Sequence, residues 1–124
     1  MTKECVFCKL DNNRIVSETE LTITLRDGFP VSPGHTLIIP KRHVSEFFEI
    51  TPAEHDEMFI ALDEAKNIVD LEFKPDGYNI GINNGVAAGQ TVMHVHMHLI
   101  PRYKDDMDDP KGGVRGVIPE KQKY

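Results

Sequence analysis

Four stretches of the chain place apolar and polar residues in patterns typical of β-strands. Residues 20–26 and 78–83 alternate between apolar and polar side chains, which predicts strands buried on one face. Residues 35–40 form a more continuously apolar run that a proline closes, and residues 94–100 place three histidines between apolar neighbours. Antiparallel pairing of 20–26 with 35–40 through the loop between them is the simplest arrangement.

Between the predicted strands 35–40 and 78–83, the pattern changes to the period of an α-helix. Thr51 can cap the helix, Pro52 suits its first position, and Glu54 completes a capping box. The helix is expected from Pro52 to Leu71, a length of about 30 Å, before residues 74–77 turn the chain. Its buried stripe is expected to contain Met58, Phe59, Leu62, Ala65, Ile68 and Val69.

The order strand, strand, long helix, strand, strand predicts an α+β fold in which one helix packs on one face of an antiparallel sheet. A length of 124 residues suits a single domain, 1–124. Within it, residues 103–124 form a polar C-terminal tail that contains several glycines and prolines. The pattern of this tail predicts no role for it.

Composition narrows the classes of partner. The chain is 40% hydrophobic and 27% charged, as in an ordinary soluble protein, and its formal net charge is −6. Because it has no basic stripe, it is not expected to bind a nucleic acid polymer. No apolar run reaches the roughly 18 residues of a membrane span, and the first residues resemble no signal peptide. We therefore expect a cytoplasmic protein without a membrane partner.

His94, His96 and His98 stand at every second position of the last predicted strand. This spacing directs all three imidazoles to one face of a strand. Imidazole titrates near neutral pH, so a neutral ring is available as a nucleophile or base. A nucleophilic histidine exposes one ring nitrogen and uses the other in a hydrogen bond that fixes the tautomer. Such a ring can attack phosphorus and form a P–N bond that water then cleaves, although the same face can also be merely solvated.

The two cysteines, Cys5 and Cys8, are separated by two residues. This spacing is typical of half of a zinc site and also of a dithiol redox centre. A redox pair is expected at the start of a helix, whereas polar residues 11–13 follow closely here. The spacing alone leaves zinc binding, two reduced thiols and redox chemistry open.

The segment His94-Val95-His96-Met97-His98-Leu99-Ile100 resembles the signature of the histidine-triad (HIT) family of nucleotide hydrolases and transferases. The resemblance extends from about Cys5 to Arg102. It implies a HIT-like fold, an antiparallel five-stranded sheet with one long helix packed on it, and a homodimer. It also implies that His96 is the catalytic nucleophile. His98, on the same face, can hold a proton that departs with the leaving group, and Gln90, just before the strand, can donate to a phosphate oxygen.

The resemblance also places a small-molecule nucleotide against several other residues. It implies Asp27 at the ribose hydroxyls, since a carboxylate can accept hydrogen bonds from a vicinal diol, and His35 and Asn83 near the phosphates. Asp and Asn are common turn residues, so a backbone role for Asp27 and Asn83 stays open. The other expected contacts are a glycine for close approach, a hydroxyl donor and two apolar residues at the base: Gly89, Thr91, Phe7 and Leu10.

In bacterial-type members of this family, the Cys-x-x-Cys pair binds zinc together with two histidines. One histidine ends a Pro-Lys-x-His segment that closes a strand, as Pro40 to His43 do here, and the other is the first triad histidine. By this resemblance, Zn²⁺ would be held in a closed structural site that leaves no position open for substrate. The expected ligands are Cys5, Cys8, His43 and His94.

The resemblance thus implies a hydrolase that cleaves at the α-phosphate of a nucleoside polyphosphate, such as a dinucleoside polyphosphate, or of a phosphoramidate. The reaction would pass through a nucleotidyl-histidine on His96. One alternative is a catalytic zinc held by the three histidines, but the ends of this strand segment lie about 13 Å apart, too far for bonds of about 2 Å. The other is a non-catalytic nucleotide-binding protein that uses the same pocket.

Overall fold

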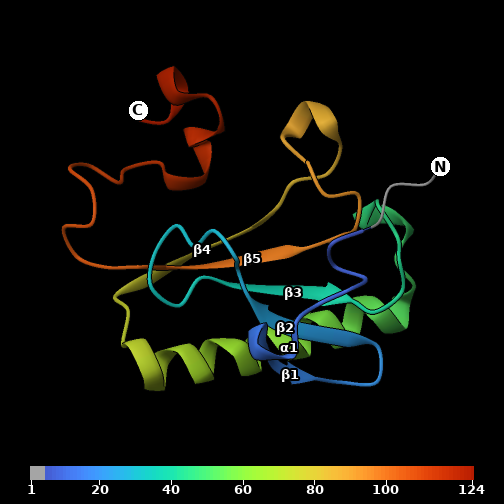
Figure 1. Cartoon of the computed structure of the whole chain (residues 1–124). Coiled ribbons are helices and arrows are strands. Elements are labelled where there is room, and N and C mark those ends of the chain that lie inside the picture. Colours follow the sequence, from blue (N-terminus) through green and yellow to red (C-terminus); the bar gives the residue numbers. More distant parts are fainter. Residues whose placement is uncertain (1–4) are drawn as a thin grey trace.

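The computed structural model describes residues 5–124 and has the expected α+β architecture (Figure 1). Its described residues form one antiparallel sheet in the order β1-β2-β3-β5-β4, so that β1 and β4 are the edges. The elements are β1 (Ile15–Glu18), β2 (Thr22–Arg26), β3 (Thr36–Pro40), α1 (Pro52–Phe73), β4 (Gly77–Ile82) and β5 (Met97–Arg102). Short 3₁₀ helices are η1 (Asn12–Arg14), η2 (Phe47–Glu49), η3 (Val86–Ala88), η4 (Gly113–Val117) and η5 (Pro119–Lys121).

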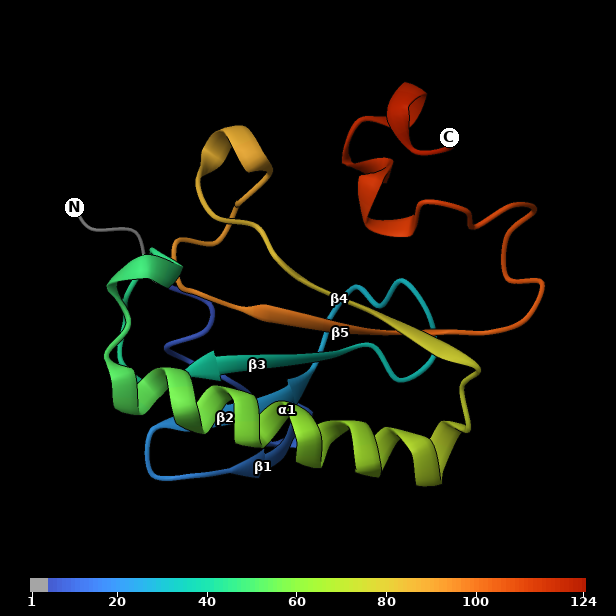
Figure 2. The same cartoon turned by 180° about the vertical axis from the view of Figure 1, so that it is seen from behind.

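Helix α1 covers one face of the sheet and runs in front of it in Figure 2. Between them lies a core that includes Met58, Val69, Met97 and Leu99. Met97 and Leu99 flank His98 in β5, and successive side chains of a strand point to opposite faces, so His98 points away from α1. Leu37 of β3 is paired with His98 in the sheet and points to the same face. His98 is therefore on the face that α1 leaves uncovered, and His96, just before β5, lines the same cavity as His98.

The start of α1 confirms the predicted capping box. Thr51 Oγ1 accepts from the Glu54 N–H at 3.1 Å, and Glu54 Oε1 accepts from the Thr51 N–H at 2.8 Å. Glu54 is buried, and Arg42 supplies two hydrogen bonds to its carboxylate, at 2.9 and 3.1 Å. These bonds lower the pKa of Glu54 and keep the carboxylate charged. The helix ends at Phe73, two residues beyond the expected end, and Lys74 adopts a left-handed conformation.

The sequence pattern missed one strand, β1, and was wrong about the burial of Phe59 and the start of β5. Strand β1 is short, and its pairing with β2 contains a register shift, so it lacks clear alternation. Phe59, expected in the buried stripe of α1, is partly exposed and packs its ring 4.8 Å from that of His55. Strand β5 begins only at Met97, because the Val95 N–H donates to the Val44 carbonyl instead of to a neighbouring strand.

The C-terminal tail, 103–124, is folded and lies near the β4–β5 end of the sheet (Figure 1). Arg115 donates to the Gln122 and Lys121 carbonyls at 3.2 and 2.9 Å, which closes the tail on itself. Gly112 has φ +85°, and a Cβ there would clash with the Gln122 backbone oxygen, so this turn requires glycine. Among residues 5–124, no helix is long and apolar enough to cross a membrane.

Candidate functional site

His96 has one ring nitrogen committed to the backbone. Its Nδ1 donates to the His94 carbonyl at 2.8 Å, which fixes the proton on Nδ1 and leaves a lone pair on Nε2. The ring is 8% exposed and lies against Phe7, with ring centroids 5.0 Å apart. His96 lines a cavity of about 450 Å³ on the face opposite α1. The segment before β5 thus presents an imidazole, oriented by its hydrogen bond to the His94 carbonyl, to a cavity.

His98 belongs to a hydrogen-bonded chain that fixes two further tautomers. The Val31 N–H donates to His35 Nδ1 at 3.0 Å, so neutral His35 carries its proton on Nε2. That Nε2 lies 2.9 Å from His98 Nδ1, which must then accept. The proton of His98 is therefore on Nε2, and the ring can offer an N–H to a bound group. Burial, and then repulsion from His96 and His35, lower the pKa of His98 to about 4.

This lowered pKa predicts a pH-dependent stability. In the unfolded chain His98 takes up a proton near its ordinary pKa of 6.5, but in the folded protein only near 4. Between these values the unfolded state binds more protons, so the free energy of unfolding falls as the pH falls. We expect chemical denaturation to give a loss about 2 kcal/mol larger for the wild type than for His98→Asn between pH 7 and pH 5. Equal losses in the two proteins would contradict this.

Most of the residues that the sequence placed at a nucleotide surround this one cavity. The catalytic candidates His96 and His98 lie on its wall with residues from loops before β3 and β5. The expected residues that line it are Phe7, Asp27, His35, Asn83, Gly89, Thr91, His96 and His98.

Gln90 and Leu10, expected in the site, do not line the cavity. The Gln90 amide donates to the Ser45 and Val92 carbonyls at 2.8 and 3.1 Å and accepts from the Gly85 N–H at 2.8 Å. These bonds occupy the side chain in holding the loop before β5. Leu10 packs, partly buried, against the core cluster of Phe7 and its neighbours.

Asp27 combines a turn role with a place in the cavity. Its Oδ1 accepts from the Phe29 N–H at 2.7 Å, as in an Asx turn. Its Oδ2 lies 3.3 Å from His35 Nε2. Burial lowers the pKa of His35, and the charge of Asp27 opposes that shift. The turn and site interpretations of Asp27 are thus compatible.

Sequence reasoning missed one cation of the cavity, Arg14. It comes from η1, directly before the unpredicted strand β1, and it is the single Lys or Arg among the described residues that line the cavity. Its Nε and Nη2 donate to the Arg26 carbonyl at 3.3 and 3.2 Å. No motif identifies this residue, because its position depends on how β1 pairs with β2.

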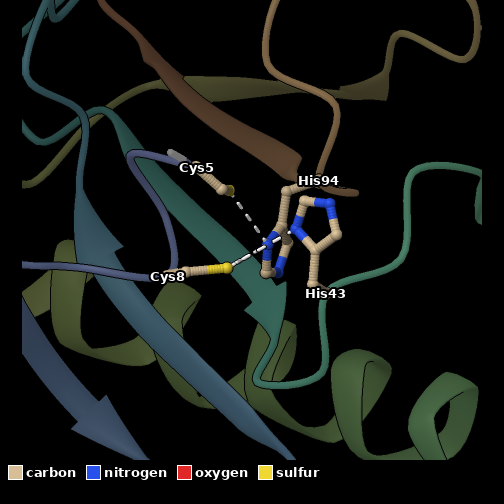
Figure 3. Close-up of side chains that lie close together, drawn as sticks. All are labelled: Cys5, Cys8, His43 and His94. Carbon is tan, nitrogen blue, oxygen red and sulfur yellow. Dashed lines mark hydrogen bonds between the residues drawn. The ribbon is translucent and has the colours of Figure 1, made fainter. Parts of the chain in front are cut away.

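A second group of side chains, drawn in Figure 3, meets where the N-terminal segment approaches the histidines. One ligand atom from each of Cys5, Cys8, His43 and His94 lies within 4.8 Å of the others. His94 Nε2 donates to the Pro40 carbonyl at 2.7 Å, so its Nδ1 lone pair faces the sulfurs of Cys5 and Cys8, 3.4 and 3.7 Å away. Two sulfurs and two imidazole nitrogens suit tetrahedral Zn²⁺, and the bond to Pro40 supplies the usual support for a metal-binding histidine.

The three alternating histidines do not form one ligand group among residues 5–124. His94 belongs to the cysteine group, and His98 belongs to a separate group with Asp27 and His35. His96 belongs to neither group. This division separates a candidate metal centre from a candidate reaction centre.

A sheet covered by one helix, with alternating histidines against a cavity on its other face, defines the histidine-triad class of domains. A model of the HIT domain matches residues 10–105. A HIT-like protein of Methanocaldococcus jannaschii is 41% identical over 120 residues, which cover 91% of each chain. The chain therefore belongs to the HIT family.

Several curated relatives carry names of enzymes, and two of them illustrate the range. The asymmetrical bis(5'-nucleosyl)-tetraphosphatase of Schizosaccharomyces pombe is 36% identical over 110 residues, 88% of this chain and 60% of that protein. A protein of Arabidopsis thaliana named as an adenylylsulfatase is 34% identical over 86% of this chain and 56% of its own length. The chain thus spans little more than half the length of these two relatives.

Solved structures of family members support the fold. A HIT family protein of Bacillus subtilis superposes with a TM-score of 0.78 at 35% identity, covering 96% of this chain and 89% of its own. A zinc-bound histidine-triad protein of Mycobacterium smegmatis gives a TM-score of 0.74 at 33% identity, with coverages of 86% and 84%. These matches confirm the predicted five-stranded antiparallel sheet with one long helix.

Proposed function

We propose that this protein is a nucleotide hydrolase that cleaves at the α-phosphate of a nucleoside polyphosphate or phosphoramidate through a nucleotidyl-histidine on His96. The observation that carries the proposal is the His96 ring, which lines a cavity and whose Nδ1 is bound to the His94 carbonyl, so that Nε2 is the nitrogen left for attack. The family membership and the hydrolase names of relatives support the same class of reaction.

In the first step, the Nε2 lone pair of His96 attacks the α-phosphorus. An N–P bond forms, and the bond from phosphorus to the leaving group breaks with its electron pair on the leaving atom. The adduct makes the ring cationic, and the His94 carbonyl, which accepts the Nδ1–H at 2.8 Å, stabilises that charge. The Nε2–H of neutral His98 donates a hydrogen bond to the departing atom and keeps its proton, and a departing amine takes the one proton that it needs from water.

In the second step, water attacks the phosphorus of the adduct. The P–N bond breaks, its electron pair returns to Nε2 of His96, and the water gives up a proton to solvent. The products are a nucleoside monophosphate and the leaving group. Because His96 recovers its original tautomer, the ring is ready for another turnover.

Other residues would position the nucleotide. We assign Asp27 to the ribose hydroxyls, Phe7 to the base, and four other residues that line the cavity to the phosphates. Arg14 adds the positive charge that a polyanionic substrate needs near the cavity. Gln90 acts as a positioning residue through the loop that it holds. The four residues that we assign to the phosphates are His35, Asn83, Gly89 and Thr91.

We further propose that the cysteine–histidine group binds a structural Zn²⁺. Its ligands would be Cys5, Cys8, His43 and His94, a closed set of four donors that leaves no position for substrate. The ion would tie the N-terminal segment to the start of the histidine strand. His94 would then fix the backbone whose carbonyl orients His96.

A homodimer is also proposed. Strand β4 is an edge of the sheet, and Ile80 on it is about half exposed, features that a second chain would cover. Sedimentation equilibrium would test this, since a monomer at micromolar concentration would contradict it. We keep the cytoplasm as the expected location and a small-molecule nucleotide as the expected partner.

The test of the proposed function is to look for both turnover and the adduct. Purified protein is expected to release AMP from diadenosine tetraphosphate, adenosine phosphoramidate or adenosine 5'-phosphosulfate. Rapid denaturation during turnover should trap one adenylyl group per active chain, located on His96 by mass spectrometry. AMP binding without turnover of any of the three compounds would favour the non-catalytic alternative. Turnover with the adduct on another residue would refute the mechanism.

A further inference from the structure

A second cavity of about 460 Å³ lies between the C-terminal tail and the uncovered face of the sheet. Its floor includes Gly81 of β4 and Ile100 of β5, which point to the face opposite α1 by their register with His98. Its outer wall is the tail itself, through Val114 and Val117 of η4, both largely exposed. We call this space the tail compartment.

The tail compartment adjoins the cavity that His96 lines, which we call the reaction cavity. Four residues line both spaces: Val31, His35, Asn83 and His98. His96, in contrast, lines the reaction cavity alone. In an in-line displacement the leaving group departs from the side of phosphorus opposite the nucleophile. The space beyond His98, away from His96, is therefore where a leaving group would extend.

The tail compartment differs from the reaction cavity in charge. Among the described residues that line it there is no Asp, Glu, Lys or Arg, whereas Arg14 and Asp27 line the reaction cavity. A polyphosphate placed there would lose water without gaining a cation, which is unfavourable. Its apolar walls, which include Ile100, Val114 and Val117, instead suit an uncharged hydrocarbon or aromatic group.

The wall that the tail provides is held in place from several sides. A Cβ on Gly113 would lie 3.1 Å from the Asn79 amide nitrogen, so tail and β4 are in close contact there. Arg102 donates to Asn79 at 2.7 Å and holds Asp106 at the start of the tail. Arg115 lies over the Tyr124 ring, 5.1 Å from its centroid. The compartment is thus part of the folded structure rather than a gap beside a loose terminus.

We infer that the tail compartment binds the apolar body of the leaving group and makes the protein selective for nucleotide derivatives whose leaving group is aromatic or hydrocarbon. The inference rests on the proposed function, because it assumes attack by His96. The bonds made and broken are those of the first step above. An aryl ester, for example, would release its phenolate with the electron pair of the broken P–O bond.

Two glycines of β4 allow a matched test. At both Gly81 and Gly77, an added Cβ would have no atom within 4 Å, and neither glycine has the positive φ that disfavours a side chain. Both lie on the uncovered face, but only Gly81 lines the tail compartment. Gly81→Val would therefore fill part of the compartment, and Gly77→Val would add the same side chain four residues away.

The experiment compares two AMP derivatives, the p-nitrophenyl ester and adenosine 5'-phosphosulfate, whose leaving group is small and charged. Gly81→Val is expected to lower the ratio of their kcat/KM values, ester over phosphosulfate, by about tenfold. Gly77→Val should leave the ratio as in the wild type. Using a ratio removes any equal effect of either valine on folding or on His98.

Each outcome decides the inference. An unchanged ratio in Gly81→Val, or an equal fall in Gly77→Val, would overturn it while leaving the proposed function intact. The wild type could instead prefer diadenosine tetraphosphate over the aryl ester, and Gly81→Val alone could abolish that preference. This result would identify a second nucleotide as the occupant of the tail compartment and would also overturn the inference. The proposed function itself would fail differently, through wild-type protein that turns over neither compound and forms no adduct on His96.

Discussion

Replacing His96 with alanine is expected to lower kcat/KM for every AMP derivative by about 10⁴-fold or more, equivalent to roughly 5 kcal/mol of transition-state stabilisation. The loss is large because the ring is the attacking group, and no other histidine offers an equivalent nitrogen. His94 Nδ1 faces the two cysteine sulfurs, and His98 Nδ1 accepts from His35. Steady-state kinetics with adenosine 5'-phosphosulfate would measure the effect.

The control for this substitution is His55→Ala. His55 lies on α1, its side chain is half exposed, and it is absent from both cavities. It should retain wild-type activity. Because His96 packs against Phe7, unfolding curves and AMP binding must accompany the kinetics. A folded His96→Ala protein that binds AMP and keeps more than a tenth of the activity would rule out His96 as the nucleophile.

The fold could be predicted largely from local signals. The capping box at Thr51 and Glu54 defines the start of α1 because all of its partners lie within four residues. Strand alternation defined β2 and β4 for the same reason. Strand β1 has no such signal, since its few residues are fixed by their pairing with β2. In the strands that the pattern did predict, the apolar positions are buried, as Leu25 and Leu37 show.

The site could be predicted only in part, because its residues come from distant parts of the chain. Spacing alone identified the histidine strand, but it could not link Cys5 to His94, 89 residues away. The family resemblance supplied that link. Gln90 is a polar residue beside the strand, yet its amide is used by the Ser45, Val92 and Gly85 backbone. The tail compartment had no sequence signal, since it arises where residues 113–117 approach β4 and β5.

Removal of zinc is expected to destabilise the protein by on the order of 4 kcal/mol, the stabilisation that a ligand supplies at about 1,000 times its Kd. The corresponding fall in Tm is more than about 10 °C. The metal would join the N-terminal segment to β3 and to the histidine strand, and without it three separate segments lose their common connection. Thermal unfolding with and without a chelator, together with zinc analysis by mass spectrometry, would measure both quantities.

The variants Cys5→Ser and His96→Ala distinguish a structural zinc from a catalytic one. Cys5→Ser should lose the metal, start with a lower Tm and show no further change with chelator, while His96→Ala should keep one zinc per chain. Burial and the neighbouring Cys5 raise the pKa of Cys8, so binding must displace thiol protons and should weaken as the pH falls. Zinc lost from His96→Ala but kept by Cys5→Ser would instead place the metal among the alternating histidines. If wild-type protein contains no zinc and its Tm does not change with chelator, the proposed zinc site is excluded.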